Sequence, residues 1–339
     1  MLSEGPMKKT EYLPFATWLR AASAIMILMC HYCIQCETPV ITSLAHIFNI
    51  GVPLFFILSG FLTGYLGIKG SILSWYVKRF KRIFVSFWIF LFFLSVVHFL
   101  RGYEAAISDW MMIFLGLQGS VVGIPGAEQT WFLSVLLLCY LLTPMVLRLS
   151  DRVYQRKSQV LLLLSAVALS VLPIGYALFE QAWVSTILTP VSIYIFACAW
   201  GRHYSANKVY SAQKTAIAVM ITVAALILRY AAKIYIDGTI WYDRVVVHYT
   251  HAIAAFAIFY AFNAVFRDSS VPGIVQLISD ISFEIYLYHY VFTVGVIPVF
   301  GVTSFWLLDC VLITALTLGI SWLMNRVTAS VHRLFSKYV

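Results

Sequence analysis

Long apolar runs dominate the sequence and restrict what it can fold into. A helix that spans a bilayer needs about 20 consecutive, mostly apolar residues. Ten runs are close to that length or longer: 17–36, 44–67, 80–100, 129–148, 158–178, 184–201, 213–236, 247–266, 279–300 and 303–325. Charged residues make up only 11% of the chain, against about a quarter in soluble domains. We therefore predict an all-α membrane protein of about ten transmembrane helices rather than a soluble enzyme.

The segments between these runs are short. A shorter apolar stretch at 105–117 is predicted to be interfacial or re-entrant, because it is too short to span a bilayer. No Ser/Gly-rich linker, low-complexity tract or long hydrophilic block separates the runs. We predict one integral-membrane domain over 1–339, and we exclude a disordered chain and a secreted disulfide scaffold.

The basic residues fit an even number of spans. Lys and Arg collect on the cytoplasmic side of membrane proteins. With both termini cytoplasmic, the outer segments hold only four of the 23 Lys and Arg residues, namely Arg101, Arg229, Lys233 and Arg244. Topology then explains the net charge of +9, so we predict no nucleic-acid partner.

Two ionisable residues in the first run are spaced to share one helix face. Arg20 and His31 are eleven residues apart, a rise of about 16 Å that returns to nearly the same face. Ionisable groups inside a bilayer are costly and are therefore functional candidates. A neutral imidazole can act as a general base near pH 7, and Arg20 could bind an anionic group. The alternative is that His31 only bridges helices and Arg20 anchors the topology.

A dense basic segment, YVKRFKR at 76–82, lies in the predicted loop between the second and third runs. Arg79 and Arg82 are three residues apart and would share a helix face, with Lys78 beside them. Arginine forks suit phosphates, so we predict an anion site here. The alternative is contact with lipid headgroups at the cytoplasmic surface.

Small residues mark the second run, GVPLFFILSGFL at 51–62. Gly60 and Gly64 form a GxxxG pair, which predicts close helix packing. Ser59 has no base at a neighbouring helical position, so nothing supports a serine-hydrolase site. Ser59 stays a candidate for lining a cavity.

The ninth run carries two polar candidates, Glu284 and His289. Both could line a polar cavity, and a purely structural role for His289 is the alternative. The cysteines of the first run are three residues apart and wind around a helix rather than forming a cage, so we expect no metal. The sequence has neither a Walker loop nor G-x-G-x-x-G, which leaves ATP-driven transport and dinucleotide chemistry without a basis.

Together these stretches resemble the acyltransferase-3 family of polytopic membrane acyltransferases, over nearly the whole chain. The matching features are the Arg-x10-His spacing of Arg20 and His31, the run at 51–62, the R-x-x-R of Arg79 and Arg82, TWFL at 130–133 and IYLYH at 285–289. Many members have Gly where this chain has Ala21, which is also small. Many also carry a soluble esterase-like domain, so this chain is similar to the stand-alone members.

The resemblance implies a multi-pass O-acyltransferase of the bacterial inner membrane with both termini cytoplasmic. It implies transfer of an acyl group, usually from acetyl-CoA, to a sugar hydroxyl of a cell-surface polysaccharide or its lipid-linked precursor. It assigns His31, with Arg20, to catalysis as a base or an acyl relay, and Arg79 and Arg82 to the acyl-CoA donor, with Lys78 beside them. Trp131 would stack on a sugar or anchor the helix at the interface. The alternative function is a transporter or flippase of a glycan or lipid intermediate, and the oligomeric state stays open.

Overall fold

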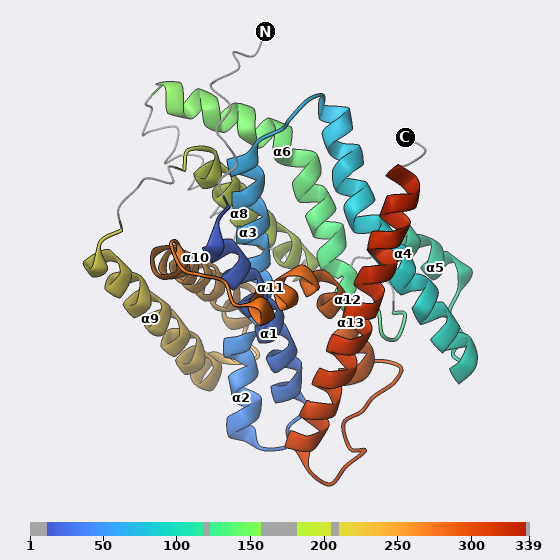
Figure 1. Ribbon diagram of the computed structural model, residues 1–339. Coiled ribbons are helices and arrows are strands. Elements are labelled where there is room, and N and C mark those ends of the chain that lie inside the picture. The colour runs from blue at the N-terminus through green and yellow to red at the C-terminus, as the bar shows by residue number, and fades with distance from the viewer. Residues whose placement is uncertain (1–11, 118–122, 157–181, 205–209, 337–339) are drawn as a thin grey trace.

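The computed structural model describes residues 12–117, 123–156, 182–204 and 210–336, and the regular elements of this part are helices (Figure 1). They are α1 Pro14–Ile34, α2 Pro39–Phe48, α3 Gly51–Leu66, α4 Ile72–Arg101, α5 Ile107–Phe114, α6 Trp131–Arg156, α8 Ala182–Arg202, α9 Ala212–Ile236, α10 Val247–Phe266, α11 Gly273–Asp280, α12 Ser282–Thr293 and α13 Trp306–Ser336. A 3-10 turn, Glu128–Thr130, precedes α6, and a π-helical turn, Tyr242–Val246, precedes α10.

The described residues confirm an all-helical chain with several helices fit to cross a membrane. Seven segments of this part are long and apolar enough to do so, and α8 adds a shorter apolar helix over Ile187–Arg202. The predicted run at 158–178 lies outside the described residues. The stretch at 105–117 forms only the eight-residue helix α5, about 12 Å long, which is too short to span.

The predicted ninth span, 279–300, is wrong as a continuous transmembrane helix. Ser279 and Asp280 are the end of α11, which stops at its C-cap, Ile281. The helix that follows, Ser282–Thr293, has 12 residues and reaches about 18 Å, against an apolar core about 30 Å thick. The chain then runs without helix to Trp306. Pro298 cannot donate to a helical ladder, and Gly301 has φ +86°, a conformation that ends helices. Hydropathy identified this segment as apolar and buried, but it did not predict where its helix ends.

Three glycines let α3 and α8 touch backbone to backbone, which confirms the close packing predicted from Gly60 and Gly64. A Cβ at Gly64 would lie 1.9 Å from the Cys198 carbonyl oxygen, and one at Gly201 would lie 2.0 Å from the Phe61 carbonyl oxygen. No side chain fits at these distances, so the helices can approach this closely only where the residue is glycine.

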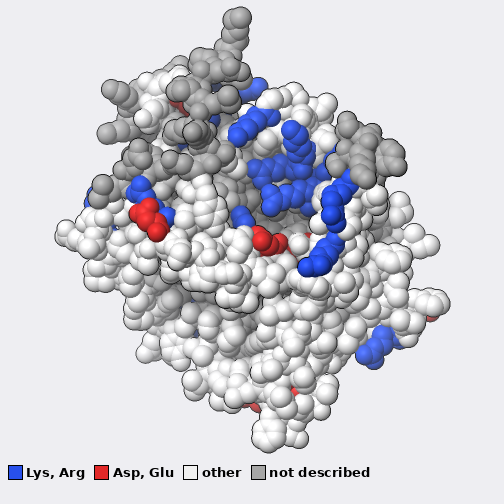
Figure 2. All heavy atoms as spheres, viewed as in Figure 1, with Lys and Arg blue, Asp and Glu red and all other residues white. Residues whose placement is uncertain are grey.

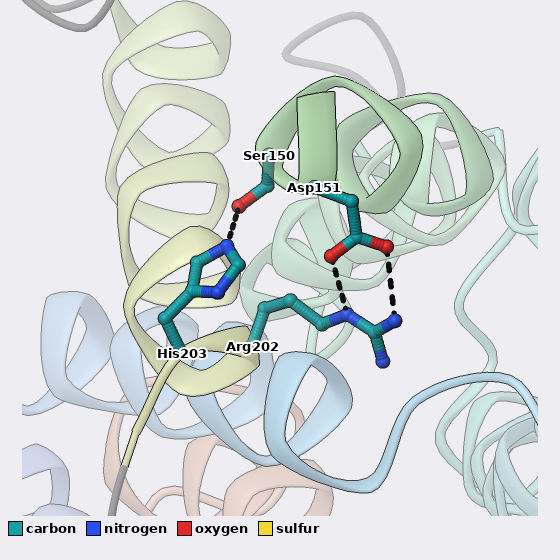
Figure 3. A network of polar contacts seen from close by, with 4 residues as sticks. All are labelled: Ser150, Asp151, Arg202 and His203. Carbon is teal, nitrogen blue, oxygen red and sulfur yellow. Dashed lines mark hydrogen bonds and ion pairs between the residues drawn. The ribbon is translucent and has the colours of Figure 1, made fainter. Parts of the chain in front are cut away.

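The C-terminal ends of α6 and α8 are joined by a polar network (Figure 3). Arg202 donates to both carboxylate oxygens of Asp151, at 2.8 and 2.9 Å, and Ser150 Oγ lies 3.0 Å from His203 Nε2. The two charged side chains are 39% and 34% exposed, so the pair adds at most about 1 kcal/mol. Its main effect is to align the two helix ends.

One end of the bundle collects most of the described basic side chains, and we call it the basic end. The ends of α3, α6 and α13 and the start of α4 lie there (Figure 1). Figure 2 shows Lys and Arg gathered around and inside a hollow on this part of the surface, with acidic side chains on its rim. The helices place these cations there: Lys69, Lys78, Arg79, Lys81, Arg82, Arg148, Arg152, Arg202 and Arg333.

We expect Gly64→Ala and Gly201→Ala each to lower the free energy of unfolding by about 3 kcal/mol, because the new methyl group would overlap a main-chain oxygen. Gly319→Ala is the matched control, since Gly319 lies inside α13 with nothing within 4 Å of an added Cβ. Thermal unfolding in detergent measures the difference. Equal melting temperatures for Gly64→Ala and Gly319→Ala would contradict the close α3–α8 contact.

Candidate active site

The basic segment at 76–82 is helical, not a loop as the sequence predicted. Helix α4 begins at Ile72, about two turns before the apolar run, because the Ser71 hydroxyl caps it by accepting from the Ser74 backbone N–H at 3.1 Å. A stripe spaced by four, three and four residues then shares one helix face: Trp75 and Ser86 are buried, Arg79 is partly buried and Arg82 is exposed. Lys78 lies beside this stripe and is exposed. Helical structure therefore puts both arginines on one face, and Lys78 on its shoulder.

Aromatic rings hold Arg79. Its guanidinium carbon lies 5.5 Å from the Trp75 ring and 5.4 Å from the Tyr140 ring, within cation–π range. The Tyr140 hydroxyl lies 3.3 Å from Ser59 Oγ. Ser59 thus belongs to the wall of this site through Tyr140, and it is not part of a nucleophile–base pair.

Arg20 and Arg82 converge on the same space from α1 and α4. The charge of Arg82 acts on Arg20, and that of Asp280, at the end of α11, opposes it. Arg20 also donates to the Ser279 hydroxyl at 3.4 Å. Two like charges from different helices are costly to hold together, so their convergence suits a site that receives an anion.

Glu284 lies at the deep side of this cation cluster. It is 3% exposed, and Ser86 Oγ donates to its Oε1 at 3.1 Å. The charge of Arg82 acts on it as well. Glu284 therefore links α12 to α4 and partly balances the arginines.

Helices α1 and α12 run parallel, which brings two pairs of residues together. Arg20 contacts Ser279 just before α12, and His31 contacts His289 within α12. The eleven residues from Arg20 to His31 rise about 16 Å. The histidines therefore lie together, about 16 Å from Arg20 along α1 and away from the basic end.

The two imidazoles form a close pair. Their ring centroids are 4.9 Å apart, and the ring of Tyr290 meets that of His31 edge-on at 5.2 Å. His289 Nδ1 lies 2.8 Å from the Tyr286 carbonyl oxygen and 3.1 Å from that of Ile285. Since a carbonyl only accepts, Nδ1 carries the proton in the neutral ring and Nε2 keeps its lone pair.

His289 Nε2 is buried and has no hydrogen-bond partner in the described part of the chain. His289 itself is fully buried, whereas His31 is partly exposed. An unpaired acceptor beside a second imidazole can receive an N–H from it, or from a bound molecule. The arrangement can therefore orient His31 as a base.

Gln129 fixes α12 from the other side. Its Nε2 donates to the Leu287 carbonyl oxygen at 2.7 Å, and the Tyr286 hydroxyl donates to the main-chain carbonyl oxygen of Gln129. Trp131, two residues on, begins α6 and is partly buried against the core. Trp131 lies near α12 through this link.

Sequence reasoning missed four residues of this region: Ser86, Gln129, Tyr140 and Tyr290. A signal for Ser86 was present, because it follows Arg82 by four residues and so shares its helix face. Tyr140 and Gln129 depend on contacts between distant helices, which no local pattern encodes. The described residues hold no group of three or more His, Cys, Asp or Glu side chains placed to bind a metal.

The acyltransferase-3 family model, described as an acyltransferase domain, matches residues 13–326. Neither a curated protein nor a solved structure is significantly similar to the chain. The match covers the histidine pair and every cation listed for the basic end except Arg333.

We expect Ser86→Ala to destabilise the protein by about 1–3 kcal/mol, because it leaves the buried Glu284 carboxylate without this donor. Ser95→Ala is the control on the same helix, since Ser95 Oγ donates only to the Phe92 carbonyl oxygen of α4. Thermal unfolding of the two purified variants in detergent compares them. If Ser95→Ala costs as much, the Ser86–Glu284 contact does not stabilise the fold.

Proposed function

Because the chain belongs to the acyltransferase-3 family of membrane acyltransferases, we propose that it transfers an acyl group from acyl-CoA, with acetyl-CoA as the donor, to a sugar hydroxyl. The observation that carries this proposal is that two parallel helices position both Arg20 and the histidine pair. Helices α1 and α12 hold Arg20 near the hollow of the basic end and the His31–His289 pair about three turns deeper.

The basic end receives the donor. CoA carries several phosphate charges, and arginines bind phosphates through paired hydrogen bonds. Arg79 and Arg82 face the hollow from one stripe of α4, with Lys78 at its edge. The pantetheine arm extends past Arg20 and delivers the thioester to the histidines. The positive-inside rule supports a cytoplasmic basic end, which is the side where acyl-CoA is made.

His31 is the residue proposed to do the chemistry, with His289 as its positioning residue. In the direct route, His31 removes the proton of the acceptor hydroxyl, and the oxygen attacks the thioester carbonyl. The C–S bond breaks, and the CoA thiolate takes the proton from His31. In a relay, a ring nitrogen of His31 attacks the thioester carbonyl, the C–S bond breaks, and CoA leaves as the thiolate. The acceptor hydroxyl then attacks the acyl-imidazole, the N–acyl bond breaks, and the hydroxyl proton neutralises the charge left by the thiolate. The lone pair of His289 Nε2 can hold the His31 N–H in either route.

The acceptor is proposed to be a surface polysaccharide or its lipid-linked precursor in a bacterial inner membrane. Trp131 lies at the start of α6, two residues after Gln129, which contacts α12. Its ring suits stacking on a sugar. A single membrane domain suffices for both substrates, since donor and acceptor reach the histidines from opposite ends of the bundle.

We expect His31→Ala to lower the rate of acyl transfer by about 10²- to 10⁴-fold, the usual contribution of a general base. The assay incubates purified protein in nanodiscs with radiolabelled acetyl-CoA and membrane glycolipids, and it follows label in the glycan and release of CoA. His332→Ala, a histidine near the end of α13, is the matched control. Full activity of His31→Ala would overturn the role of His31, and label trapped on wild-type protein would identify the relay.

Arg79→Met and Arg82→Met are each expected to raise KM for acetyl-CoA about tenfold or more, since each removes charge-assisted hydrogen bonds to phosphate. The same variants should use acetyl-pantetheine, which lacks these phosphates, as well as the wild type does. Arg333→Met removes an exposed charge at the basic end and serves as the control. An equal loss with both donors would place the effect elsewhere than at the phosphates.

His289→Phe is expected to lower kcat about tenfold or more and leave KM for acetyl-CoA unchanged. Ring packing persists, but the acceptor that orients His31 is lost, and residues that hold a reacting group commonly contribute 10- to 100-fold. Steady-state kinetics separate the two parameters. A rise in KM alone, or a matching fall in folded protein, would show that His289 is only structural.

A further inference from the structure

A second buried cation lies far from the basic end. Arg229 is 3% exposed and continues a stripe of small residues, Ala218, Thr222 and Ala225, by which α9 faces α10. It lies seven residues before the end of α9 at Ile236, about 10 Å. Burying an arginine inside a membrane costs free energy, so a buried arginine there is a candidate functional residue.

Arg229 has few partners for its five N–H donors. One nitrogen, NH1, donates to the Val247 carbonyl oxygen at 2.9 Å. Its Nε is buried without a hydrogen-bond partner in the described residues, and so is the Tyr242 hydroxyl from the π-helical turn. Tyr242 is also only 3% exposed. Two unpaired polar groups from different elements therefore lie in one buried region, and π-helical turns are frequent at functional sites.

No described carboxylate neutralises Arg229. The ionisable side chains coupled to it are mostly histidines, His46, His248 and His251. Two acids lie near Tyr242. Asp237 is bound to Lys233 at 2.5 Å, and that hydrogen bond lowers the pKa of the Asp237 carboxyl, while Asp243 follows Tyr242 in the π-helical turn. Neither acid is among the charges that act on Arg229. The site is therefore cationic and lacks an anion of its own.

This cluster lies near α1, the helix that carries His31. The charge of Arg229 acts on Cys30, the residue immediately before His31 in α1. An anion held at Arg229 would thus lie near the part of α1 that carries His31. A donor bound at the basic end leaves this part of α1 for the acceptor.

We propose that Arg229 and Tyr242 bind the phosphoryl anion of a membrane amphiphile, the lipid-linked sugar phosphate that serves as acceptor. The assignment of acceptor rests on the proposed function. An arginine fork matches phosphate oxygens. Arg229 lies about 10 Å from the end of α9. A lipid-linked phosphate already has its apolar chain in the membrane, whereas a soluble sugar would have to leave water to reach this depth. Tyr242 supplies a neutral donor that no group in the described residues accepts from.

Binding of polyprenyl phosphate to the purified full chain tests the site, with native mass spectrometry from detergent as the readout. We expect Arg229→Met to weaken binding about tenfold or more, from the loss of charge-assisted hydrogen bonds. Arg101→Met removes an exposed charge at the same end of the bundle and should bind as the wild type does. Unchanged binding by Arg229→Met, or no binding by the wild type, would overturn the proposal.

Tyr242→Phe keeps the test decisive if Arg229→Met folds poorly. Without a ligand, loss of an unpaired buried hydroxyl should leave stability unchanged or raise it. With polyprenyl phosphate, the variant should lose affinity several-fold. A loss of stability without ligand and no loss of affinity would refute the ligand role.

Competition with phosphatidylglycerol separates the two sources of the phosphoryl group. Phosphatidylglycerol that competes equally with polyprenyl phosphate would overturn the acceptor assignment and leave a lipid-headgroup site. The readout is independent of acyl transfer, so the two proposals can fail separately. His31-dependent CoA release without phosphate binding would refute only this inference, whereas phosphate binding without acyl transfer would refute only the proposed function.

Discussion

The parallel contact of α1 with α11 and α12 sets the geometry of both ends of the site. Because the helices run the same way, Arg20 near the start of α1 meets Ser279 near the end of α11. Eleven residues further along α1 and ten residues after Ser279, His31 and His289 meet. An antiparallel pair would have brought Arg20 beside His289 and left His31 without an imidazole partner. The short loop of α11 into α12, through Ile281, makes this direction possible.

The exclusion of water from the helix bundle constrains how its buried polar groups are arranged. A buried polar group without a partner costs free energy, so most of those in the described region are paired, as Glu284 is with Ser86. The unpaired ones are informative for the same reason. His289 Nε2 and Arg229 Nε belong to different helices, α12 and α9, and each lacks a hydrogen-bond partner in the described residues. Their positions indicate where substrates, rather than side chains, would complete the hydrogen bonding.

The fold class and the Arg20–His31 spacing could be predicted from sequence because both depend on local patterns. Apolar runs and the helical repeat need no knowledge of distant contacts. The helical character of 76–82 was missed because cations suggest a loop, although the Ser71 cap and the Trp75–Ser86 stripe were readable. The break after Thr293 and the pairing of His31 with His289 depend on tertiary structure, which hydropathy does not encode. The roles of His31, Arg79 and Arg82 stay predictions.

The glycine contact between α3 and α8 has a mechanical consequence. Main-chain atoms of the two helices meet at Gly60, Gly64 and Gly201, so there are no long side chains between them that could change rotamer and absorb a displacement. The pair therefore moves as a single rigid wall. Any widening that admits a bulky donor must come from the opposite wall, where flexible side chains of α4 and α13 face the hollow.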